Sequence, residues 1–163
     1  ASPSQPHSAG GGSAVSWQTP STQAQPSAHQ VPPASRQQAS PSLPHRLFLI
    51  HKGELPQRGQ YVAFRWPGGG PYPAGVTFVK VIAGMAGDAV TRADQDFFVN
   101  GTHVGHAKTV SRQGIPLEPG LTGVLPTGRY YVRAPHPDSL DSRYRLTGWI
   151  SESQIIGRAY ALF

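Results

Sequence analysis

Hydrophobic residues in this chain come in short runs that glycines and prolines separate. Gln60 to Trp66 alternates between polar and apolar side chains, which predicts a half-buried strand. Val76 to Ala83 is the strongest apolar run and predicts a buried strand. Further strands are predicted at Leu47 to Ile50, Tyr130 to Arg133 and Ile155 to Phe163, although the last run also fits a short helix.

A hairpin is predicted at Asn100-Gly101, because this dipeptide favours the tight turn between two strands. The apolar runs Phe97 to Val99 and Val104 lie on either side of it. No segment shows ten or more residues with a clean helical period. About seven short strands, separated by turns, predict an all-β, compact and barrel-like domain.

The first 39 residues have a different composition, rich in Ser, Pro, Gln, Ala and Gly. They contain no acidic residue, one basic residue (Arg36) and one aromatic residue (Trp17). Such a segment buries too little apolar surface to offset the entropy lost on ordering. We therefore expect a disordered tail or linker over residues 1–39 and a folded domain over residues 40–163. The alternative is a tail that docks through Val15 and Trp17.

Composition excludes several functional classes. The chain has no cysteine, which excludes disulfide bonds, a thiolate zinc site and a cysteine nucleophile. The net charge is +6, which fits an ordinary soluble basic protein or, alternatively, a basic face for nucleic acid or anionic lipid. However, only three of the 14 basic residues are lysines and no basic run is present, so a polybasic membrane patch is not supported. No apolar stretch reaches the roughly 18 residues that a transmembrane helix needs.

Lys80 is the first candidate for chemistry. Alternate residues of a strand share a face, so Phe78, Lys80 and Ile82 are expected on one face of their strand. Burying an ammonium group among apolar neighbours is unfavourable, which lowers the lysine pKa until the neutral amine is populated. A neutral amine is a competent general base. The alternative is a lysine that extends to solvent from the end of the strand.

A lysine base needs a nucleophile, and Ser42 is a candidate because the flanking prolines stiffen its segment. The alternative is an ordinary serine of a Ser/Pro-rich linker. Farther along, Ser139, Asp141 and Arg143 share a face if their segment is extended. Asp141 and Arg143 can then pair, and Ser139 can offer its hydroxyl to an amine. The alternative here is a polar surface turn.

Four pieces of sequence occur in a recognisable order: Ser-Leu-Pro from Ser42, FVKVIAGMAGD around Lys80, PHPDSLDSRY, and IIGRA near the end. Together they resemble the signal-peptidase (S26) superfamily of Ser/Lys-dyad peptidases. Within that superfamily, the chain looks like the conjugal-transfer pilin-maturation peptidases, the TraF-like branch. The resemblance covers about Ser40 to Phe163 and implies a signal-peptidase-type catalytic domain.

The resemblance implies a catalytic role for each matching position. Ser42 would be the acylating nucleophile and Lys80 its general base. The backbone N–H of Ser42 and the hydroxyl of Ser40 would form the oxyanion hole. Ser139 would orient the Lys80 amine, and Arg143 would hold Asp141, an acidic position important in the family. The turn after the lysine strand would be shaped by Gly84, Gly87 and Asp88.

The implied function is a serine endopeptidase that processes a pilin precursor in conjugative transfer. The acyl-enzyme would be released to water, or to an amine in a cyclising transpeptidation. The expected partner is an extended peptide or pilin precursor, and no nucleic acid, metal or organic cofactor is implied. The implied location is the periplasmic face of the bacterial inner membrane, with a native membrane anchor that this sequence does not contain.

The chain also departs from the leader-peptidase pattern. Val81 and Ala86 stand where those enzymes usually carry Arg and Pro, and a Pro/His-rich stretch replaces their Gly-Asp-Asn. These departures favour the conjugation branch over a general type I signal peptidase.

Two further functional classes compete with these peptidases. A self-cleaving Ser/Lys regulator shares the dyad chemistry, but it would need a helical DNA-binding domain, and residues 1–39 show no helical pattern. A non-enzymatic domain that binds nucleic acid or a secretion-complex partner would use aromatic and basic side chains together. The residues that offer this combination are Arg129, Tyr130, Tyr131 and Arg133.

The histidines do not predict a metal site. His103 and His106 are three residues apart on one hairpin arm, which puts them on opposite faces if the arm is extended. No carboxylate or cysteine lies at metal-ligand spacing from them. A Ser/His/Asp triad through His136 has no supporting motif.

Overall fold

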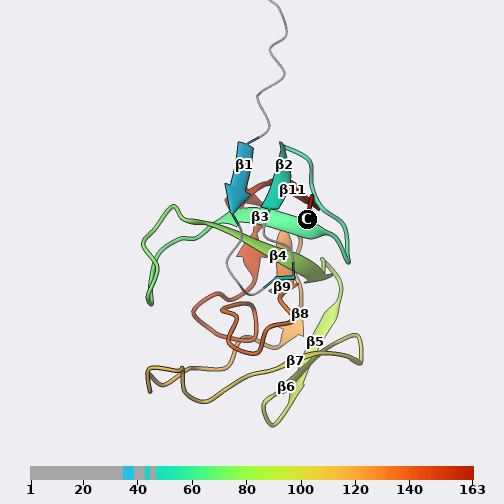
Figure 1. Cartoon of the computed structure of the whole chain (residues 1–163). Coiled ribbons are helices and arrows are strands. Elements are labelled where there is room, and N and C mark those ends of the chain that lie inside the picture. Colours follow the sequence, from blue (N-terminus) through green and yellow to red (C-terminus); the bar gives the residue numbers. More distant parts are fainter. Residues whose placement is uncertain (1–34, 39–42, 45–46) are drawn as a thin grey trace, which may run out of the picture. The chain divides into compact units, whose positions relative to one another are not determined.

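The computed structural model describes residues 35–38, 43–44 and 47–163, and its strands form two sheets (Figure 1). The seven-stranded sheet has the order β1 (Ser35–Gln38), β2 (Leu47–Lys52), β11 (Ile155–Ala161), β3 (Tyr61–Arg65), β4 (Thr77–Gly84), β9 (Arg129–Arg133) and β10 (Ile150–Ser151). The four-stranded sheet has the order β7 (Thr102–His106), β6 (Asp96–Val99), β5 (Ala89–Ala93) and β8 (Gly123–Val124). A short 3-10 helix, η1 (Glu152–Gln154), joins β10 to β11. The all-β prediction is confirmed.

Each strongly apolar run is a strand: β2, β3, β4, β9 and β11 lie where the pattern predicts them, and the last is a strand rather than a helix. Strands β5, β8 and β10 were not predicted. β5 is mostly exposed, and β8 and β10 have two residues each. Such strands have too few apolar positions to show a period of two.

Strand β1 lies inside the segment that we expected to be a tail. Ser35 pairs with Ile50 and Gln38 with Leu47, so Ser35–Gln38 forms an antiparallel edge strand on β2. The rest of residues 1–39 lies outside the described residues. Strand pairing uses backbone groups, which every non-proline residue carries, so a polar composition did not reveal this strand.

The predicted hairpin joins β6 to β7. Asn100 and Gly101 have φ values of 48° and 78°, as a type I′ turn requires. The register between the two strands then shifts, because Phe98 pairs with His103 whereas Phe97 pairs with Gly105. This bulge leaves one residue of β7 unpaired and changes which side the following residues face.

The bulge overturns the expectation that His103 and His106 lie on opposite faces. Nε2 of His103 and Nδ1 of His106 lie 2.9 Å and 3.1 Å from the same carboxylate oxygen of Asp96. Within residues 35–38, 43–44 and 47–163, no group of three His, Cys, Asp or Glu side chains is arranged to hold a metal ion.

Strands β4 and β9 lie between two apolar cores. Tyr130 and Val132 of β9 belong to a core with Phe78 of β4, whereas Tyr131 points into a core that includes residues of the four-stranded sheet. At the end of β4, a Cβ on Gly84 would lie 2.7 Å from Leu125, so a larger residue would not fit there without a shift. The strand that carries Lys80 is therefore held by packing on both sides.

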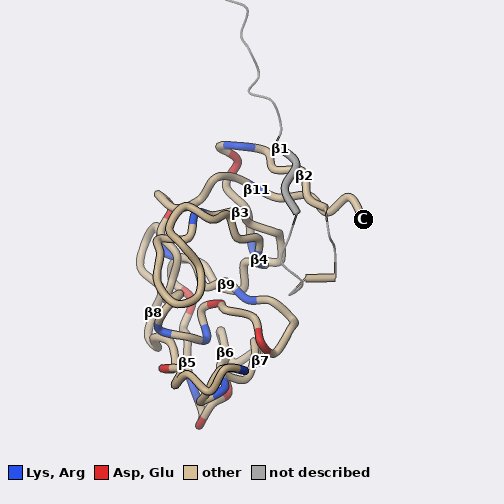
Figure 2. The backbone as a smooth tube through the Cα atoms, turned by 60° about the vertical axis from the view of Figure 1, so that its left-hand side comes forward, with Lys and Arg blue, Asp and Glu red and all other residues tan. Residues whose placement is uncertain are grey.

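Charged residues of both signs lie close together around β5, β6 and β7 (Figure 2). Ion pairs such as Arg58 with Asp88 and Lys108 with Asp138 offset part of the positive charge locally. No helix in the described part of the chain has the length and apolar character needed to cross a membrane.

Candidate active site

The Lys80 side chain is buried at the middle of β4, with 3% of its surface exposed. Its Nζ donates a hydrogen bond of 2.6 Å to Oγ of Ser139 and lies 5.5 Å from the centre of the Phe78 ring. The alternative of a lysine that extends to solvent is therefore wrong. Packing on an aromatic face and one short hydrogen bond hold the amine in a defined position.

Burial lowers the pKa of Lys80 from 10.5 to about 8. The negative charge of Asp141 opposes this shift, and the positive charge of Arg143 adds to it. A pKa near 8 leaves roughly a tenth of the amine neutral at pH 7, and a larger share as the pH rises. The amine can therefore accept a proton near neutral pH.

Residues 138–147 form a series of turns rather than the extended segment that would place alternate residues on one face. The turns nevertheless bring Asp141 and Arg143 together. Nε of Arg143 donates to Oδ1 of Asp141 at 2.8 Å, and Nη2 donates to Oδ2 at 2.9 Å. The backbone N–H of Ala134, just after β9, donates to the same carboxylate at 3.0 Å. The acid is thus tied both to its own turn and to the large sheet.

Arg143 also holds the backbone of this turn. Its Nη2 donates to the carbonyl oxygens of His136 and Ser139 at 3.1 Å and 3.2 Å, and its Nη1 donates to that of His106 at 3.0 Å. Burial alone would lower the Arg143 pKa, but the hydrogen bonds and charge of Asp141 raise it, so the guanidinium stays charged. Arg143 therefore fixes the position of Ser139 relative to both sheets. Ser139 in turn accepts the hydrogen bond from the Lys80 amine.

The Asp88 carboxylate holds the turn after β4 in place by accepting several hydrogen bonds. Nη2 of Arg58 donates to both carboxylate oxygens at 2.8 Å and 2.6 Å, and the Met85 N–H and the Asn100 side chain donate at 2.7 Å and 2.8 Å. Burial opposes ionisation of Asp88, but these hydrogen bonds lower its pKa below the usual value. Gly87 in this turn has a φ of 88°, which favours glycine. Sequence reasoning did not anticipate Arg58, because it lies 30 residues from Asp88.

Ser40 and Ser42 lie outside the described residues. Leu43, which follows Ser42, is described and is 7% exposed. It belongs to one apolar cluster with Val79, the residue before Lys80, and with Ala134. The chain next to Ser42 is thus anchored to the cluster that contains the lysine strand.

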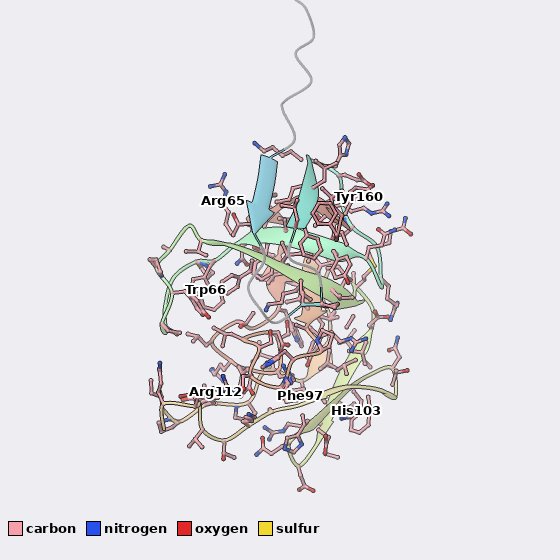
Figure 3. All side chains as sticks on the ribbon, in the orientation of Figure 1. Arg65, Trp66, Phe97, His103, Arg112 and Tyr160 are labelled. Carbon is pink, nitrogen blue, oxygen red and sulfur yellow. The ribbon has the colours of Figure 1, made fainter. Side chains whose placement is uncertain are left out.

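A pocket of about 850 Å³ borders Ser139, and the sequence did not predict it. Its walls come from three segments: residues 70–72 of the loop between β3 and β4, residues 108–118, and residues 138–146. Trp66 lies at the start of that loop, and Arg112 lies on the second wall. Figure 3 shows both labelled side chains on the same side of the folded domain. The segments are far apart in sequence, which is why no local motif indicated the pocket.

Comparison with known proteins identifies the class of enzyme. The family model described as signal peptidase, peptidase S26, matches residues 28–163. The protein is a serine peptidase. More specifically, the chain belongs to the S26 signal peptidase family.

One solved structure to which the chain is similar is the crystal structure of a signal peptidase I from Enterococcus faecalis V583. The two share 25% sequence identity, the match covers 68% of this chain and 98% of that chain, and the TM-score is 0.44. A search of curated proteins gave no significant match.

Proposed function

We propose that Ser42 is the nucleophile of this peptidase and that Lys80 is its general base. The observation that carries the proposal is the buried Lys80 amine, 2.6 Å from Ser139 Oγ, whose pKa is lowered to about 8. A base with a pKa close to the working pH is both available in its neutral form and able to return its proton. The burial of Leu43 beside Val79 also supports the assignment.

In the proposed reaction the neutral Lys80 amine removes the hydroxyl proton of Ser42, whose Oγ attacks the scissile carbonyl carbon. The Ser42 N–H and the Ser40 hydroxyl stabilise the oxyanion. When the C–N bond breaks, the Lys80 ammonium returns its proton to the leaving nitrogen, and an ester to Ser42 remains. Water, activated by the neutral amine, then hydrolyses this ester. Ser139 acts as a positioning residue that keeps Nζ in place.

The edge of β4 is a suitable surface for an extended peptide. Among the described strands, β9 pairs with β4 from Val81 to Gly84, so the edge from Thr77 to Val79 has no described strand partner on that side. A peptide can add to such an edge through backbone hydrogen bonds. We expect the acyl part of the substrate, which precedes the scissile bond, to bind along this edge.

We further propose that the substrate is a pilin precursor, processed in conjugative transfer at the periplasmic face of the inner membrane. The residues Val81 and Ala86 and the stretch Pro135 to Pro137 support this branch over the general leader peptidases. The second candidate is a general signal peptidase that removes leader peptides from secreted proteins. The family description, signal peptidase, favours this candidate.

Trapping of the acyl-enzyme tests the dyad. The intact mass of the protein is measured after incubation with an acylating serine inhibitor or a precursor peptide. An adduct is expected on the wild type and on two control variants, Lys52→Ala and Ser153→Ala, which change exposed residues of the same types. It is expected to be absent from Ser42→Ala and Lys80→Ala. An adduct that persists on Ser42→Ala would exclude Ser42 as the nucleophile.

The pH dependence of acylation tests the base separately. Because only the neutral amine can accept the proton, the acylation rate should rise with pH and reach half of its maximum near pH 8. A rate that is independent of pH between 6 and 9 would argue against Lys80 as the base.

A substrate panel separates the two candidate functions. A pilin precursor and several secretory precursors are incubated with the enzyme, and the products are identified by mass. Preferential processing of the pilin precursor supports the conjugation function, and a product lighter by one water molecule than the linear peptide indicates cyclisation. Equal processing of all precursors supports the general signal peptidase.

A further inference from the structure

The pocket beside Ser139 exposes several large apolar side chains. Ile115, Leu146 and Tyr72 line it and are 54%, 41% and 40% exposed. Exposed apolar residues that converge on one concavity are typical of a binding site. Leu146 is held against the loop between β3 and β4, because its side chain fills the space where Gly70 would carry a Cβ. The walls formed by residues 70–72 and 138–146 are therefore in contact.

The charged residues at the pocket are paired with one another. Asp138 forms ion pairs with two basic residues. Nζ of Lys108 contacts Oδ1, and Nε of Arg112 lies 3.0 Å from Oδ2. Arg145 faces Glu118 at 3.7 Å. Each of these charged groups already contacts an opposite charge, so a charged ligand group would have to compete with an existing ion pair, although the three bases and two acids together carry a net charge of +1. The pocket is therefore suited to a neutral, apolar side chain.

The pocket and the reacting groups share Ser139. This residue lines the pocket and also accepts the hydrogen bond from Lys80 Nζ. Among the described residues that line the pocket, none belongs to β4, but the Tyr72 ring packs edge-on against Phe78 of that strand, with ring centroids 5.1 Å apart. The pocket therefore adjoins the edge proposed for the acyl part of the substrate without including it. Lys80 must return its proton to the leaving nitrogen. The peptide that continues from this nitrogen therefore starts next to the Lys80–Ser139 pair.

We propose that this pocket is the subsite for an apolar side chain on the leaving-group side of the substrate, within the first few residues after the scissile bond. The inference rests on the proposed Ser42/Lys80 chemistry. It assigns part of the substrate selectivity to the segment that follows the cleavage site. Residues 70–72, 108–118 and 138–146 would provide that selectivity.

A series of substrates with one common acyl segment tests the proposal. One member is an ester without residues on its leaving side, and one continues with three glycines. Three further members carry leucine at the first, second or third of these positions. In the wild type, leucine at one position should raise kcat/KM about tenfold over glycine, as expected for partial burial of its side chain.

Ile115→Asp should remove this gain and leave hydrolysis of the ester unchanged, because the ester does not reach the pocket. Leu121→Asp is the matched control, since Leu121 is 41% exposed but does not line the pocket. The subsite is excluded if leucine gives no gain at any position, or if the gain persists in Ile115→Asp. If the wild type fails to hydrolyse the ester, the Ser42/Lys80 proposal itself fails, and the subsite with it.

Discussion

Two Asp–Arg pairs lie near the lysine strand, and they differ in how much water reaches them. Asp141 and Arg143 are 0% and 3% exposed, whereas Asp88 and Arg58 are 11% and 50% exposed. The buried pair holds the turn that presents Ser139 to Lys80. The half-exposed pair closes the turn after β4. The same two residue types therefore position a candidate catalytic group in one region and fasten a loop in the other.

The physical difference between the pairs lies in what remains when one partner is removed. A carboxylate left without its partner in the interior has no water to solvate its charge. Asp88 is also largely buried, but its partner Arg58 is half exposed, so the charge of this pair is partly solvated by water and screened by salt. We therefore expect the consequences of mutation to be much larger around Asp141 than around Asp88.

The largest effect is expected for Arg143→Met. This change leaves Asp141 buried without its counter-ion, which should lower the free energy of unfolding by about 3–5 kcal/mol. Urea unfolding at pH 7 measures it. The double variant Asp141→Asn/Arg143→Met is the control, and it should recover part of the loss because neither member of the pair leaves an unpaired charge behind. A loss below about 1 kcal/mol for the single variant would contradict the picture of a dry, buried pair.

Lys80→Met should abolish acylation and yet stabilise the fold at pH 7. The folded protein has a Lys80 pKa of about 8, against 10.5 for the ordinary group, so burying the ammonium costs about 3 kcal/mol below pH 8. Between pH 8 and 10.5 the unfolded chain binds more protons, so wild-type stability rises and this cost disappears.

Unfolding of Lys80→Met and wild type at pH 7 and at pH 10.5 checks this expectation, with the exposed Lys52→Met as the control. The stability difference between Lys80→Met and wild type should shrink at the higher pH. An unchanged difference would show that Lys80 does not titrate with a lowered pKa.

Ser139→Ala should have an intermediate effect on stability and a clear effect on activity. Without the Ser139 hydroxyl the Lys80 amine loses this hydrogen bond, so the free energy of unfolding should fall by about 1–2 kcal/mol. Since the hydrogen bond also favours the charged amine, the midpoint of the pH–rate profile should move to lower pH. Ser139→Thr, which keeps the hydroxyl, should restore the midpoint. A purely structural role would lower stability without moving this midpoint.

The smallest effect is expected for Arg58→Ala. Asp88 keeps its hydrogen bonds from the Met85 N–H and from Asn100, and the Arg58 side chain that is removed is half exposed. The free energy of unfolding should fall by about 1 kcal/mol or less, and the loss should shrink in 1 M salt. Unfolding at low and high salt measures it. A loss as large as that of Arg143→Met would remove the distinction between the two pairs.

The sequence by itself determined the strands and one turn, because both depend on local chemistry. A period of two in β3 and β4 requires no knowledge of the rest of the chain. Asn100-Gly101 adopts positive φ values wherever it occurs in a tight hairpin. The same periodicity put Lys80 on a face with Phe78, and the resemblance indicated Ser139 and Arg143 as its supporting residues.

Only the tertiary structure decided how these groups are arranged. Ser139 lies 59 residues from Lys80, and Arg58 lies 30 residues from Asp88. A single bulge in β7 put His103 and His106 on one carboxylate. Burial, pKa and pocket shape depend on neighbours from distant segments, and a one-residue shift changes which neighbours these are. For this reason the sequence could predict a lysine base with a lowered pKa, but whether Lys80 is buried or extends to solvent, and where the pocket beside it lies, follow from the fold.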